Sequence, residues 1–258
     1  MLALLVFAIA AALAFIEARR SAYDDAAQWR NEVRISLLLG AAALLIELAL
    51  PAREGPAWSG GLALALAVFI ADDFLYYLSH RLSHRVSLFW ASHAVHHSPV
   101  RYNLFTGLRQ PPTWLLTPAA AAPVALLGLG APAVLVAASA TLRAVHHFLI
   151  HTERVRTLPA WIEYIFNTPS HHRVHHSTDP AHLDRNFGGV LIVWDRLFGT
   201  FTAEPKGGSA QRYGLVHPIR GGAWATFAAP WERLWSRMRA APTAPAALRR
   251  ALAPPEAH

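Results

Sequence analysis

Long apolar runs alternate with short polar segments along most of the chain. Residues 1–16, 35–50 and 62–78 form three such runs, and residues 114–129 and 133–150 form two more around a turn with Gly128, Gly130 and Pro132. A bilayer-spanning helix needs about 20 apolar residues, and each run approaches this length. The pattern predicts an all-α integral membrane protein with a bundle of about four to five transmembrane helices, the last two forming a helical hairpin. The first run lacks a preceding positive segment, so we expect a retained helix and not a cleaved signal peptide.

Composition and charge support the membrane class and give the chain an orientation. Hydrophobic residues make up 54% of the 258 positions and charged residues 15%, which is unusual for a soluble domain. Four arginines lie in the polar segment 19–34, which the positive-inside rule places in the cytoplasm. Following the runs from there puts every histidine-rich segment on the cytoplasmic side of a bacterial inner membrane or an equivalent membrane. The net charge of +7 favours contact with anionic headgroups, and we expect no nucleic-acid partner.

Histidines occur in four groups at the ends of the apolar runs or after them. On a helix, residues three or four positions apart lie on one face, and each group contains such a spacing. The candidate ligands chosen by this spacing are His80, His84, His93, His96, His97, His147, His151, His172, His175 and His176. A single His-x-x-x-His pair is more often structural than metal-binding, but four such segments in one chain predict a metal site.

The ligand types restrict the metal chemistry. The chain has no cysteine, which excludes thiolate zinc sites and cysteine-ligated iron–sulfur clusters. Ten imidazoles are too many for one ion and fit two metals with five ligands apiece, or four plus a bridge. Imidazole suits Zn, Cu, Fe and Ni alike, so the ligands alone do not select the metal.

Other polar residues near the groups are candidates for supporting roles. His146 and His171 point about 100° away from their neighbours on an ideal helix, so we expect them to have structural or ligand-orienting roles. The residues that could orient ligands by hydrogen bonds are Asp73, Asp179, Asp184, Glu163 and Asn103. Arg109 and Arg173 could bind an anionic headgroup or pair with carboxylates, and Trp194-Asp195-Arg196 is interpreted as structural.

Two of the histidine segments sit in longer motifs. These are Asp73-Phe-Leu-Tyr-Tyr-Leu-Ser-His80-Arg-Leu-Ser-His84 and Trp90-Ala-Ser-His93-Ala-Val-His96-His97. They resemble the first two histidine boxes of the fatty acid hydroxylase/sterol desaturase superfamily. The segments 162–176 and 186–201 are most similar to its alkylglycerol monooxygenase branch. The resemblance covers roughly residues 70–201, and the ten candidate ligands fall on the family's histidine boxes.

The resemblance implies an activity, a fold and cofactors. It implies a non-haem di-iron centre with two Fe ions that activates O2 to hydroxylate or desaturate a lipid from the bilayer. It also implies a membrane core under a cytoplasmic, histidine-rich helical cap that holds the metals. Members of this family need an external reductant, either tetrahydropterin or an electron-transfer protein. Hydroxylating an unactivated C–H bond needs a redox metal, so zinc does not fit this activity.

We therefore divide the chain into three parts. Residues 1–61 hold the N-terminal transmembrane helices and a loop, residues 62–201 the catalytic domain, and residues 202–258 a cytoplasmic, basic and partly disordered segment. Within the last part, residues 231–239 suit a helix on an anionic membrane surface, and we expect disorder in residues 241–258. A lipid monooxygenase is the first hypothesis, and a desaturase or carotenoid-type hydroxylase is the second. A non-enzymatic metal-binding or transport protein is the third hypothesis. The residues do not identify the lipid substrate or the oligomeric state.

Overall fold

A computed structural model describes residues 2–18, 26–49, 60–205 and 212–255 of the chain. Within these ranges the regular structure is helical, apart from two isolated β-bridges, Phe166–Leu191 and Ser177–Tyr213. The all-α prediction is confirmed. The expected loop at 51–61 lies almost entirely outside the described residues, as does the end of the chain from 256 onward.

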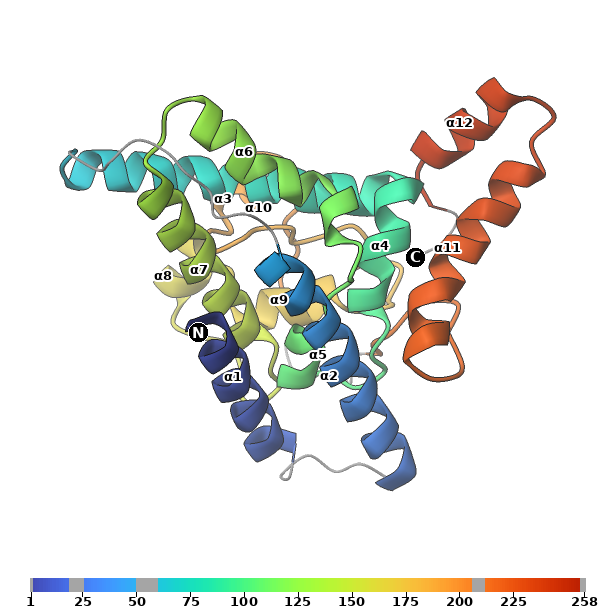
Figure 1. Ribbon diagram of the computed structural model, residues 1–258. Coiled ribbons are helices and arrows are strands. Elements are labelled where there is room, and N and C mark those ends of the chain that lie inside the picture. Colours follow the sequence, from blue (N-terminus) through green and yellow to red (C-terminus); the bar gives the residue numbers. More distant parts are fainter. Residues whose placement is uncertain (1, 19–25, 50–59, 206–211, 256–258) are drawn as a thin grey trace.

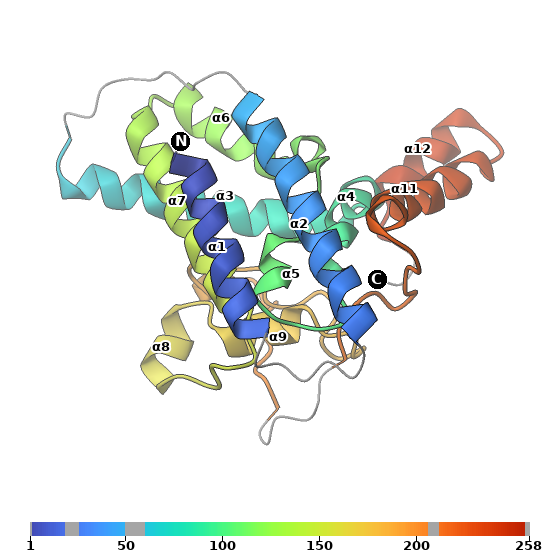
Figure 2. The same cartoon turned by 60° about the horizontal axis from the view of Figure 1, so that its bottom comes forward.

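Three of the longer helices run side by side on one side of the molecule (Figures 1 and 2). They are α1 (Leu2–Ala18), α2 (Ala26–Ala49) and α7 (Ala133–Ile150), and the short helix α5 (Leu104–Leu108) contacts all three. Ala14, Val33, Phe105 and Leu108 form the buried core of this packing. Burying such side chains supplies the main favourable free energy that holds α5 in place. The position of α5 matters because Arg109, the residue that follows it, contacts His96.

Helix α3 (Leu62–Arg85) crosses the three-helix layer and packs against α7 (Figure 1). The third apolar run continues without a break through His80 and His84, as the spacing predicted. Helices α3 and α7 are the two described helices that are long and apolar enough to cross a membrane. Only 28% of the apolar window of α3 and 22% of that of α7 are buried, whereas a core helix of a soluble protein is mostly buried. This exposure is consistent with a lipid environment.

The fourth apolar run is a broken segment and not one continuous helix. It contains two 3-10 turns, η1 (Trp114–Leu116) and η2 (Pro118–Ala120), followed by α6 (Ala121–Gly128). Thr117, directly before Pro118, is extended with φ −104° and ψ 158°, because a residue before proline avoids the helical region. The predicted turn after this run is confirmed, with Gly130 at φ 86°. Its first arm is nevertheless irregular, so the prediction of a simple helical hairpin was wrong.

Short helices and loops cover the ends of α3 and α7. These elements are α4 (Ser87–His97), α8 (Ala160–Ile165), α9 (Pro169–His175) and α10 (Val193–Leu197). Thr168 and Pro169 begin α9, with proline in the first turn, where its missing N–H costs no hydrogen bond. Helices α4 and α9 together contain six of the fifteen histidines.

The C-terminal part forms a helical hairpin, in which α11 includes the helix expected at 231–239 and α12 lies where we expected disorder. Helix α11 (Ala223–Arg239) packs on α4 and α2, and α12 (Ala244–Leu252) folds back onto α11 and α4 (Figure 1). Thr243 caps α12 through its side chain, and Ala251 is buried with Ala91 and Leu234. The carbonyl of Ala253 also accepts hydrogen bonds from Ser87. Small alanine side chains allow this close packing, so a composition typical of disorder gives an ordered helix here.

Candidate metal centre

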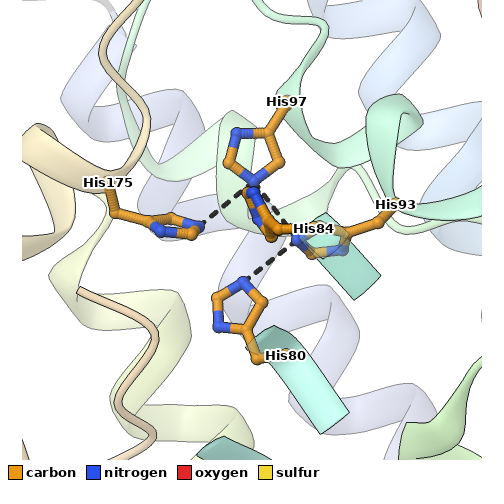
Figure 3. A group of neighbouring side chains, drawn as sticks. All are labelled: His80, His84, His93, His97 and His175. Atoms are coloured by element: carbon orange, nitrogen blue, oxygen red, sulfur yellow. Dashed lines mark hydrogen bonds between the residues drawn. The ribbon is translucent and has the colours of Figure 1, made fainter. Parts of the chain in front are cut away.

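The structure brings nine of the ten candidate ligands together in two groups. The first group contains His80, His84, His93, His97 and His175 (Figure 3), and the second contains His96, His151, His172 and His176. In each group the candidate ligand atoms all lie within 4.8 Å of one another. Eight of the nine side chains are buried, and His93 is half-buried. We name these sets the five-histidine group and the four-histidine group.

Neighbouring Nε2 atoms lie at distances that suit coordination of a common ion. In the five-histidine group, Nε2 of His93 lies 3.0 Å from Nε2 of His80 and 3.2 Å from Nε2 of His97 (Figure 3). In the four-histidine group, Nε2 of His151 lies 3.1 Å from that of His172 and 3.2 Å from that of His176. With metal–nitrogen bonds of about 2.1 Å, ligand nitrogens on a tetrahedron or octahedron are about 3.0–3.4 Å apart. The donor set therefore fits a metal ion in each group.

Helical phase explains which histidine enters which group. A residue four positions on is rotated by about +40°, and a residue three positions on by about −60°. His93 and His97, four apart on α4, accordingly share the five-histidine group, whereas His96 enters the four-histidine group. The same phase holds in α9 and the residue that follows it, where His172 and His176 share the four-histidine group and His175 joins the five-histidine group.

The two groups are in direct contact. The ring of His97 stacks on that of His176 with centroids 4.3 Å apart, and His172 stacks on His175 at 5.1 Å. Each of these pairs has one member in each group. Two ions held here would therefore be near neighbours, which is the geometry of a dinuclear centre.

Backbone carbonyls orient several of the rings through their second nitrogen. Nδ1 of His80 donates to the carbonyl of Phe187 at 3.0 Å, that of His96 to Arg109 at 3.1 Å, and that of His175 to Arg185 at 2.9 Å. A carbonyl can only accept, so Nδ1 carries the proton and the lone pair of Nε2 faces the group. This arrangement fixes the tautomer that binds a metal.

Buried polar side chains hold the loop that supplies two of these carbonyls. Asp195 accepts hydrogen bonds from the backbone N–H groups of Phe187 at 2.8 Å and Gly188 at 2.7 Å. Asn186 has φ 57° and donates its amide to the carbonyl of His171 at 3.0 Å. The structural interpretation of Asp195 is thus confirmed. Every residue has a backbone carbonyl, so residue type does not show which carbonyls accept these hydrogen bonds. The sequence therefore identified the histidines but not their acceptors.

The imidazoles of His96, His175 and His176 are held in the neutral form. Burial lowers the pKa of His96 to about 4. The pKa of His175 and of His176 also lies well below the usual value, because burial and neighbouring histidines disfavour a positive charge. Neutral imidazole is the form that coordinates a metal, so no proton has to leave these side chains at neutral pH.

His147, the tenth candidate ligand, lies outside both groups. Its Nε2 is 3.2 Å from the carbonyl of Gly189, and its Nδ1 is 3.4 Å from the Tyr76 hydroxyl. The predicted pairing of His147 and His151 on one helix face does not hold, because α7 ends at Ile150. His151 has left the helix, with φ −79° and ψ 63°, and therefore reaches the four-histidine group.

This placement gives a testable difference between the two residues. We expect His147→Ala to retain bound metal, because the two ring nitrogens of His147 contact a carbonyl and a tyrosine hydroxyl. Its contact with the groups is an edge-on packing of its ring against His172 and His80. His151→Ala should lose about one ion per chain, because Nε2 of His151 contacts three other candidate ligands. Metal content of the two purified variants by mass spectrometry checks this. Equal losses from both variants would contradict the placement of His147.

The two histidines set apart by helical phase have other contacts. His146 Nε2 donates to the carbonyl of Asn167 at 2.8 Å. His171 Nε2 lies 2.9 Å from Oε2 of Glu163, which also accepts from the Ser170 hydroxyl at 2.6 Å. Glu163 thereby joins α8 to the first turn of α9, and three candidate ligands follow within the next six residues of the chain.

The remaining candidates have different roles. Nδ1 of His84 lies 3.7 Å from Asp184, whereas Asp73 accepts from the backbone N–H groups of Val190 and Leu191 and so holds the 185–191 loop. Asn103 caps α5, and Asp179 accepts from Ala181 N–H in a local turn. The two arginines pair with carboxylates, Arg109 with Glu32 and Arg173 with Glu204, each at 2.7 Å.

Comparison with known proteins agrees with this geometry. The sequence profile of the fatty acid hydroxylase family matches residues 65–200, which is 136 of the 258 residues and includes all ten candidate ligands. The chain belongs to the fatty acid hydroxylase family. The family predicted from the histidine motifs is therefore confirmed.

Individual relatives within the fatty acid hydroxylase family are similar over the same part. An alkylglycerol monooxygenase of Danio rerio is 40% identical over 191 residues, covering 69% of this chain and 39% of the relative. That of Homo sapiens is 43% identical over 158 residues, covering 59% and 33%. Ornithine lipid hydroxylase OlsE of Rhizobium tropici is 33% identical over 177 residues, covering 68% and 52%. The chain thus spans about a third of the length of the alkylglycerol monooxygenases, and no solved structure matches it.

Proposed function

We propose that the chain is a membrane-bound, O2-dependent lipid monooxygenase with a non-haem di-iron centre. The observation that carries the proposal is the pair of contacting histidine groups, with five and four imidazoles. Relatives named monooxygenases and hydroxylases support the reaction class. The substrate would be an alkyl, ether-lipid or sterol-like lipid.

The choice of iron follows from the proposed reaction. Imidazoles bind several divalent metals, but inserting oxygen into an unactivated C–H bond requires a metal that changes its oxidation state. When bound, the two irons would supply the redox chemistry with O2 that protein side chains lack. The five-histidine group would hold one ion and the four-histidine group the other.

The chain's own residues would bind the ions and exclude water around them. Eight of the nine imidazoles are buried, so competing water has little access to the centre. Carbonyls of Phe187, Arg109 and Arg185 keep three rings pointing inward. Preorganised ligands of this kind lose less conformational entropy when the metal binds.

We place this centre at the membrane face. Helices α3 and α7 end at Arg85 and Ile150, next to His84 and His151, and both expose apolar side chains along their length. A lipid chain in the bilayer could therefore reach the centre without crossing water. We infer four to five spans in total, with the histidines on the cytoplasmic side, from the distribution of arginines.

Monooxygenation also requires a source of two electrons. One oxygen atom of O2 enters the lipid, and the other is reduced to water with two electrons and two protons. The sequence contains no cysteine for an iron–sulfur centre. We therefore propose an external reductant, either tetrahydropterin or an electron-transfer protein.

The test is metal analysis combined with isotope-labelled turnover. Protein purified in neutral detergent should contain about two irons per chain. With a lipid extract, a reductant and ¹⁸O₂, one lipid should gain a single ¹⁸O atom. A lipid that loses two hydrogens without gaining ¹⁸O would indicate desaturation. Protein that contains zinc but no iron, and shows no O2-dependent turnover, would overturn the enzymatic proposal in favour of a metal-binding protein.

A further inference from the structure

A pocket of about 340 Å³ lies between α4 and α11. The two helices lie side by side in both views (Figures 1 and 2). Trp90, Ala94, Leu215 and Leu234 make most of its wall apolar. The volume is at the lower end of ligand-binding pockets, so it suits a headgroup or a short segment of a lipid and not a whole two-chain lipid.

The polar part of the pocket is cationic. Arg233 and Arg237, four positions apart on α11, both line it, and none of the described residues that line it is acidic. Arg233 donates through both terminal nitrogens to the carbonyl of His217 at 3.1 Å, and Arg237 donates to the Ser87 hydroxyl at 3.0 Å. These contacts hold both guanidinium groups at the pocket. Two guanidinium groups of one helix in a pocket whose wall is mostly apolar suit an anion carried by an apolar molecule.

The pocket adjoins the five-histidine group through a single side chain. Trp90 lines the pocket, and its ring lies with its centroid 5.0 Å from His84 and 5.4 Å from His97. The same indole therefore lines the pocket and contacts two candidate metal ligands. A molecule bound by the arginines would lie beside the metal centre.

We propose that this pocket binds the anionic headgroup of the lipid substrate, with phosphate as the group that Arg233 and Arg237 contact. The claim that this lipid is the substrate rests on the proposed function. The claim that the pocket binds an anionic amphiphile does not. Arg109 and Arg173, which the sequence also offered for this role, are paired with Glu32 and Glu204. The pocket arginines are the ones that line a cavity next to the centre.

The experiment measures binding to the purified full chain in neutral detergent. The probes are a monoacylglycerol phosphate, the matching uncharged monoacylglycerol and inorganic phosphate, with bound probe measured by native mass spectrometry. We expect Arg233→Gln to weaken binding of the monoacylglycerol phosphate by roughly 10-fold, since a charge-assisted hydrogen bond is lost. The double variant with Arg237→Gln should weaken it further. The uncharged monoacylglycerol should bind all variants equally.

Arg239→Gln is the matched control. Arg239 is on the same helix but packs over Trp235, with its guanidinium 5.0 Å from the ring centroid, and does not line the pocket. Binding within about twofold of the unmodified protein supports a specific site. An equal loss in Arg239→Gln would indicate general surface attraction and overturn the proposal, as would unchanged binding in Arg233→Gln. Inorganic phosphate competing as well as the lipid would show a site for free anions instead. All of these outcomes are independent of turnover and of the bound metal.

Discussion

Replacing His175 with alanine should remove about one of two bound irons and lower lipid oxidation by at least about 100-fold. Nε2 of His175 lies 3.2 Å from Nε2 of His97, inside the five-histidine group. Mutating a residue that only hydrogen-bonds to a metal ligand lowers metal affinity or activity by about 10–100-fold. Removing a ligand itself should lower activity further. A dinuclear reaction needs both ions, so activity should fall further than the iron content.

His176→Ala should give the same loss by emptying the other group. His176 follows His175 in the chain, but its Nε2 lies 3.2 Å from Nε2 of His151 in the four-histidine group. Double variants therefore separate the two ions. His97→Ala with His175→Ala, both in one group, should still hold about one iron. His175→Ala with His176→Ala, one in each group, should hold almost none.

His182→Gln serves as the control for these variants. His182 belongs to neither group, and its Nδ1 contacts the Ser177 hydroxyl at 3.0 Å, a contact that a glutamine can replace. We expect this variant to keep both irons. Iron per chain, product yield and thermal unfolding of each purified variant are the measurements. If the two double variants held equal amounts of iron, the division into two groups would be wrong.

Helical spacing carried enough information to find the centre and to separate neighbouring histidines into two groups, but not to place His147. The pairs four residues apart predicted shared faces, and the structure brings nine of the ten candidates together. The opposite assignments of His96 and His97 follow from the same rotation per residue, so they could have been predicted. The position of His147 outside both groups could not have been predicted, because its pairing with His151 is lost where α7 ends at Ile150 and His151 turns away from the helix.

Features that depend on tertiary packing were beyond the sequence. The carbonyl of Arg109 reaches His96 because the Arg109 side chain is fixed by Glu32 on α2, far away in the sequence. The break in the helix predicted at 114–129 is, in contrast, a local effect, because Thr117 before Pro118 avoids the helical region. The helix α12 also needed tertiary information, because its alanines become favourable only when packed against α4 and α11.

The metal-free protein should lose stability as the pH falls from about 6.5 to about 4. In the fold, burial lowers the pKa of His96 to about 4, and the pKa values of His93, His97 and His172 also lie well below normal. In the unfolded chain these groups titrate near 6.5. Above pH 6.5 both states are neutral. Below it the unfolded chain takes up protons that the folded chain does not, so acidification favours unfolding.

The size of this effect follows from the number of histidines involved. For His96 alone, a pKa of about 4 in the fold against 6.5 unfolded corresponds to roughly 3 kcal/mol at pH 4 or below. Several buried imidazoles act in the same direction, so the loss should be large compared with a typical stability of about 5–15 kcal/mol. Iron-loaded protein should withstand a lower pH, because metal binding keeps the imidazoles deprotonated and stabilises the fold. Thermal unfolding of chelator-treated and iron-loaded protein from pH 8 to pH 4 measures both curves. If the unfolding temperatures of the two samples fell by the same amount below pH 6.5, these histidines would not bind the metal.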